Sequence, residues 1–138
     1  MHVEGAFAPE TESAARERYE LLGPTGQTVV REVAKAMGLD REEYDRRVTS
    51  EVVATARDAI FASMLEVHVG SFDEYERWCD DHPAYDREVA GSEHVDHVAW
   101  HAAPFAEMVV AATFQSEEEA AVATLRRQAY GRIYRDVL

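Results

Sequence analysis

The sequence predicts one α+β domain over residues 1–138: N-terminal helices, a small and mainly antiparallel sheet of about three strands, and a long C-terminal helix packed on that sheet. Three observations predict this class. Apolar residues recur at helical spacing through the first half of the chain, alternate along short segments of the second half, and return to helical spacing at the end. Helices that flank a cluster of strands are typical of α+β domains, in which they cover one face of the sheet.

Helices are expected through the first half of the chain. Gly23-Pro24 ends the first and Gly38 the second, because glycine and proline stop a helix. The second helix has an apolar face made of Val29, Val30, Val33 and Met37. The helix that Thr49 or Ser50 can cap has the longest apolar side, so we expect it to be central and well buried. The expected segments are helices over residues 13–22 and 25–37, a short charged turn that Asp40 can cap and that runs through Arg47, and a helix over residues 50–64.

Alternating patterns then predict three strands, at residues 65–69, 95–101 and 108–114. A hairpin connection that contains Pro104 is expected between the last two. A helix over residues 92–102 remains an alternative, because periodicity alone does not classify short apolar runs.

Two further helices are expected in this half. The segments Ser71 to Glu74 and Ser116 to Glu119 have the pattern of a capping box, in which a serine and a glutamate satisfy the first backbone N–H groups of a helix. The first of these helices should run to about Asp81 and the second to the C-terminus. Residues 83–93 are expected to form a loop.

Histidine is concentrated in the second half, where five of the six histidines fall within 34 positions. On a helix, His94, His97 and His101 would share one face and could bind a divalent transition metal. On a strand, which we prefer, His97 and His101 share a face and His94 points the other way. The same alternation places Glu66 beside His68 on the preceding strand.

We therefore expect one side of the sheet to gather Glu66, His68, His97 and His101. The other side would form the core with Val67, Val69, Val98, Trp100, Val110 and Phe114. Imidazole and carboxylate groups can bind a divalent transition metal or act as an acid–base pair near neutral pH. The alternative is structural, since histidines are common on half-exposed faces, where they bond to carboxylates or water.

Two other groups are candidates. Cys79 and His82 have the spacing of a nucleophile and its base on neighbouring helical turns, but Cys79 also continues an apolar helix face, which indicates a small buried side chain. Arg127, Tyr130 and Tyr134 on the final helix could form a contact surface with aromatic and arginine anchors. Such residues also commonly pack over the edge of their own domain's core.

The chain carries 27 acidic and 14 basic residues, a net charge of −13, and only one of its bases is a lysine. This composition is expected in the salt-rich cytoplasm of a halophile, where a short Debye length screens self-repulsion; an acidic protein from a GC-rich bacterium is the alternative. It argues against nucleic-acid binding by the whole domain and leaves the arginines of the last helix as a weaker candidate for RNA contact. No apolar run suits a membrane span and no signal-peptide pattern is present, so we expect a cytoplasmic location.

Two stretches resemble a known family: Val98-Ala99-Trp100-His101, and the segment from Ala111-Ala112-Thr113-Phe114 through Ala120 to Gln128. With the acidic composition, they make nearly the full chain similar to a family of short uncharacterised haloarchaeal proteins, known only as a domain of unknown function. The resemblance implies a salt-rich archaeal cytoplasm. It supplies no activity, cofactor or catalytic residue.

No nucleophile elbow, phosphate loop, dinucleotide fingerprint or specific metal motif is present in the sequence. We therefore expect a protein that acts through protein–protein contacts, either as a homo-oligomer such as a homodimer or with another protein. The alternative is a small metal-binding or acid–base enzyme that uses the His/Glu cluster of the sheet.

Overall fold

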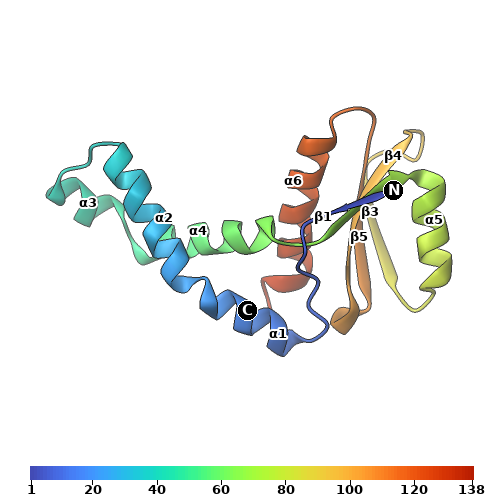
Figure 1. The fold of residues 1–138 in the computed structure, drawn as a ribbon, viewed down its shortest axis with the longest axis horizontal. Coiled ribbons are helices and arrows are strands. Elements are labelled where there is room, and N and C mark those ends of the chain that lie inside the picture. The colour runs from blue at the N-terminus through green and yellow to red at the C-terminus, as the bar shows by residue number, and fades with distance from the viewer.

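The computed structural model describes residues 1–138 and confirms the α+β class (Figure 1). Its elements follow one another as β1 (His2–Glu4), α1 (Glu12–Leu21), α2 (Gly23–Ala36), α3 (Arg41–Arg47), α4 (Ser50–Ser63), β2 (Val67–Ser71), α5 (Phe72–Asp81), β3 (Asp86–Ala90), β4 (His97–Ala103), β5 (Met108–Phe114) and α6 (Glu118–Ala129). A 3-10 turn, Pro104–Ala106, joins β4 to β5, and a π-helical turn, Tyr130–Tyr134, extends α6. None of the helices combines the length and the apolar character that crossing a lipid bilayer requires.

The five strands form one mixed sheet in the order β1-β2-β4-β5-β3, in which only the β3–β5 pair is parallel. The sheet therefore has five strands rather than about three. β3 falls in the predicted loop, because all five of its residues are exposed and three are charged, which leaves no alternation to detect. β1 is only three residues long. Residues 97–103 are a strand, so the helical alternative for this region is wrong.

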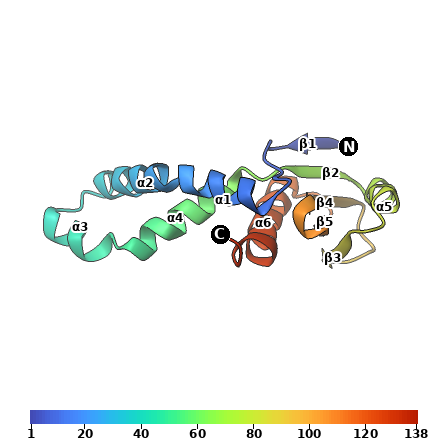
Figure 2. The same ribbon diagram turned by 90° about the horizontal axis from the view of Figure 1, so that it is seen from below.

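Helices cover both faces of the sheet rather than one (Figure 2). On one face, Val67, Val69 and Ala99 pack with α6; on the other, Trp100 packs with α5. The predicted core side is therefore divided between the two faces. Each strand alternates as expected, but β2 and β4 are paired so that His68 lies opposite Trp100, which turns Trp100 away from the Val67 side.

A helical arm, residues 23–63, extends away from the sheet (Figures 1 and 2). α2 and α4 pack side by side along it, and α3 closes its far end. α4 is buried only at Phe61 and Ala62, so the expectation that it is central and well buried is wrong along most of its length. The reason is that the sheet and α6 meet only its C-terminal end.

Aromatic packing fixes the arm to the rest of the domain at Phe61. Its ring makes edge-on contacts with Phe7, Tyr19, Tyr130 and Tyr134, at centroid distances of 5.3–6.0 Å. These rings come from three different parts of the chain: the segment before α1, α1 itself and the π-helical turn after α6. The base of the arm is therefore held by the same core that joins α6 to the sheet.

The two predicted capping boxes have different outcomes. Ser71 and Glu74 form the first, with Glu74 N–H donating to Ser71 Oγ and Ser71 N–H donating to Glu74 Oε1. The second does not form, because α6 begins at Glu118 with Glu117 at its cap and no side-chain cap hydrogen bond. Ser116 lies one residue too early to cap this helix.

Candidate functional site

The structure does not bring the predicted histidine set together. Glu66 and His68 are adjacent, with Glu66 Oε1 3.1 Å from His68 Nε2. His68 stacks on Trp100 and shares its face of the sheet, on the side of α5. His97 and His101 lie on the opposite face because alternation separates them from Trp100. The sheet therefore stands between the two halves of the predicted metal site.

His101 is fully buried, and both its ring nitrogens are engaged. Nδ1 lies 2.6 Å from the carbonyl oxygen of Glu66, and Nε2 lies 2.7 Å from the hydroxyl of Tyr134. Because a carbonyl only accepts, Nδ1 carries the proton, and the Tyr134 hydroxyl donates to Nε2. Burial lowers the pKa of His101 to about 4, against an ordinary 6.5. His101 thus acts as a neutral hydrogen-bonding residue of the core.

The predicted contact residues of the last helix do not share one surface. Tyr130 and Tyr134 are buried, and Arg127 is exposed. Desolvation raises the pKa of both tyrosine hydroxyls. The two rings belong to the core around Phe61, so no aromatic and arginine patch forms on this surface.

Cys79 and His82 do not form a nucleophile–base pair. Cys79 is buried beside Tyr75 and Trp100, and burial raises the pKa of its thiol. The His82 ring stacks on Trp78, and its Nδ1 lies 2.7 Å from the Trp78 carbonyl oxygen. Both side chains therefore have structural roles in packing.

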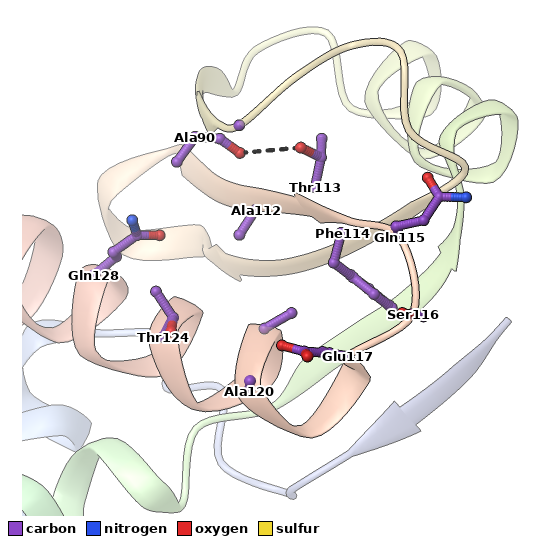
Figure 3. Close-up of a pocket in the computed structure, with 12 residues that line it drawn as sticks. Ala90, Ala112, Thr113, Phe114, Gln115, Ser116, Glu117, Ala120, Thr124 and Gln128 are labelled. Atoms are coloured by element: carbon purple, nitrogen blue, oxygen red, sulfur yellow. Dashed lines mark hydrogen bonds between the residues drawn. The ribbon is translucent and has the colours of Figure 1, made fainter.

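An open pocket of about 430 Å³ lies between α6 and the ends of β3 and β5 (Figure 3). Its walls are mostly small residues. Gly91, at φ +102°, allows Thr113 to approach closely, since a Cβ there would be 2.1 Å from the threonine hydroxyl. Thr124 and Gln128 project from α6 toward the sheet, and Gln128 Oε1 is buried without a partner. The pocket offers hydrogen bonds but contains no histidine or cysteine.

An apolar stripe on the helical arm is exposed to solvent. It consists of Val29 (41% exposed), Val33 (52%), Met37 (57%) and Val52 (43%). The sequence identifies the first three as part of an apolar helix face, but α4 covers only part of that face. We call these four residues the arm stripe.

Helical geometry places the arm stripe on one side of the arm. Val29 and Val33 directly precede Val30 and Ala34, which are buried between the helices. α4 approaches α2 closely at Gly26, where a Cβ would lie 3.3 Å from the backbone nitrogen of Arg57. On α4, Val52 directly precedes Val53, which lies one helical turn before Arg57. One residue toward the N-terminus is a rotation of about 100° around a helix. Because α2 and α4 run antiparallel, this rotation points to the same side of the arm on both helices.

The arm also differs from the rest of the chain in charge. Residues 23–63 carry seven acidic and six basic side chains, a net charge of −1. The remaining residues therefore carry −12 of the total −13. The exposed apolar side chains thus lie on a part of the molecule where acidic and basic residues nearly balance.

Comparisons with known proteins give a family but no activity. No curated protein and no solved structure matches the chain. One family model does match, over residues 6–135, and its description is a family of unknown function, DUF5809. This confirms the resemblance to a domain of unknown function. The chain belongs to the DUF5809 family.

Proposed function

We propose that this protein is an association module that forms a homodimer through the arm stripe. The observation that carries the proposal is an apolar stripe left uncovered on a projecting, nearly neutral helical arm. Contiguous apolar surface that the domain itself leaves open is typical of interaction sites. A pair of helices buries only the sides that face each other, so the stripe requires a further layer for burial.

Charge favours a second copy of the chain as the occupant. Two copies meeting through their sheets would bring together residues 64–117, which include α5 and four of the five strands and carry a net charge of −10. Meeting through the arms brings together two regions of charge −1, so the repulsion between like charges is far smaller there than between two sheets. Two antiparallel helix pairs packed stripe to stripe form a four-helix bundle, a common and self-complementary arrangement.

The test is the molar mass in solution, measured by size-exclusion chromatography with light scattering at high salt. We expect the wild-type chain, of 15.5 kDa, to elute at about twice that mass. The double variant Val29→Glu/Val33→Glu places two charges within the stripe and should elute as a monomer. A matched control, Gln27→Glu/Thr28→Glu, adds the same charge to exposed positions on the polar side of α2 and should remain dimeric.

Two results would overturn the proposal. One is a wild-type chain that stays monomeric at the highest soluble concentration, which would leave the stripe to a different protein. The other is a dimer that both double variants disrupt equally, since added charge rather than the stripe would then explain the loss. Circular dichroism of each variant separates lost association from lost folding.

We also propose a salt-rich cytoplasm, and an archaeal halophile, as the setting of this protein. The support is the net charge of −13 with a single lysine. At molar salt the Debye length falls to about 3 Å, which screens most of the repulsion on the sheet and α5. The apolar contact of the arms is not weakened by salt, because hydrophobic burial does not depend on charge.

A further inference from the structure

We infer that His2, Glu4 and Glu118 form a binding site for a divalent transition metal at the junction of β1 and α6. These are not the residues that the sequence analysis assigned to a metal. His2 Nε2 lies 3.2 Å from Glu4 Oε2 and 3.2 Å from Glu118 Oε2. All three donor atoms lie within 4.8 Å of one another.

The fold brings these residues together from opposite ends of the chain. His2 and Glu4 alternate on β1 and therefore point to the same face of the sheet. β1 pairs with β2 so that His2 lies opposite Val69 and Glu4 opposite Val67, both of which face α6. Glu118 is the first residue of α6, which starts above this edge. The group is thus built by the register of β1 and the start of α6.

The donor set has the chemistry of a transition-metal site. One imidazole nitrogen and two carboxylate oxygens suit Zn²⁺, Mn²⁺ or Fe²⁺, and the two carboxylates balance the charge of the ion. Bonds of about 2.0–2.2 Å in a tetrahedral site separate neighbouring donors by about 3.3–3.6 Å. The two imidazole–carboxylate distances, 3.2 Å each, are already close to that spacing.

The site is open to solvent, because the side chains of His2, Glu4 and Glu118 are 50%, 40% and 43% exposed. Three protein ligands leave at least one coordination position for water or a ligand, as in catalytic rather than structural zinc sites. A bound ion would also tie the edge strand β1 to α6.

The test is titration of the untagged full chain with ZnCl₂ by isothermal calorimetry, supported by Co²⁺ absorption spectroscopy. We expect one equivalent of Zn²⁺ to bind the wild type and the d–d bands of four- or five-coordinate Co²⁺ to appear. His2→Gln and Glu118→Gln should each weaken binding at least tenfold. His94→Gln removes an exposed histidine from a loop and should bind as the wild type does.

Glu118→Gln is the decisive variant. A chelate made by His2 and the neighbouring Met1 amine would not depend on Glu118, whereas the assembled site does. We therefore also expect Zn²⁺ to raise the melting temperature of the wild type and to leave that of Glu118→Gln unchanged. Binding that is absent, not stoichiometric, or equally strong in Glu118→Gln would overturn the inference. In those cases His2 serves only as an ion-pair partner of the two carboxylates.

Discussion

The buried His101–Tyr134 pair should make folding stability depend on pH in a predictable direction. Burial lowers the pKa of His101 to about 4 in the folded protein, while the unfolded chain has the ordinary value of 6.5. Between these values the unfolded chain binds a proton that the folded chain does not. The free energy of unfolding therefore falls as the pH is lowered from 6.5 to about 4 and is unaffected by His101 above that window.

The size of the effect follows from the difference between the two pKa values. Each tenfold difference in proton affinity corresponds to about 1.4 kcal/mol, so His101 contributes about 3 kcal/mol across the whole window. About 2 kcal/mol of this is lost between about pH 7 and about pH 5. Because His101 is fully buried, solvent does not screen this contribution appreciably.

Urea denaturation at the two pH values, at constant salt, measures this contribution. The wild type should lose about 2 kcal/mol more than His101→Gln, because glutamine does not titrate. The control His97→Gln makes the same change at an exposed position of the same strand and the same face. It should retain the wild-type pH dependence. An equal loss in the wild type and His101→Gln would refute the assigned role of His101.

Three further predictions concern the Tyr134 hydrogen bond, the turn at Gly91 and the net charge of the chain. Tyr134→Phe removes the donor to His101 Nε2 and should lower the free energy of unfolding by about 1–3 kcal/mol; an unchanged urea midpoint would contradict the hydrogen bond. Gly91→Ala should lower the free energy of unfolding by about 2–3 kcal/mol, because φ is +102° there and a Cβ would collide with Thr113. Gly38→Ala should lower it by only about 1 kcal/mol, because φ is +69° and no atom lies within 4 Å; equal losses would refute the steric argument. Raising KCl from about 0.1 M to about 2 M should raise the melting temperature by several degrees, and a fall would contradict the charge argument.

Local signals predicted individual elements well. Ser71 and Glu74 identified the start of α5 because a capping box is a short-range pattern. Alternation identified β2, β4 and β5, and Pro104 identified the connection between the last two. β3 could not be found in this way. Its residues are exposed and mostly charged, and only their tertiary pairing with β5 at the sheet edge defines them as a strand.

The candidate sites were harder to predict because they depend on relations between elements. Alternation correctly placed His97 and His101 on one face, but it could not show that this face lies opposite His68. That depends on the register between strands far apart in sequence. The arm stripe illustrates a different limit. Val29 and Val33 have the pattern of a core face, and a core face and an interface look alike in sequence.

The measurement that tests the dimer most directly is the distance between spin labels on two copies of the chain. Lys35→Cys labels the polar side of the arm and Arg87→Cys labels the sheet, both at exposed positions, while Cys79 is buried. With helices about 10–12 Å wide and a 14-residue α2 about 21 Å long, a bundle of arms should hold Lys35→Cys labels within about 35 Å. Labels at Arg87→Cys should lie farther apart. No inter-chain signal, or a shorter distance between the sheet labels, would contradict association through the arm.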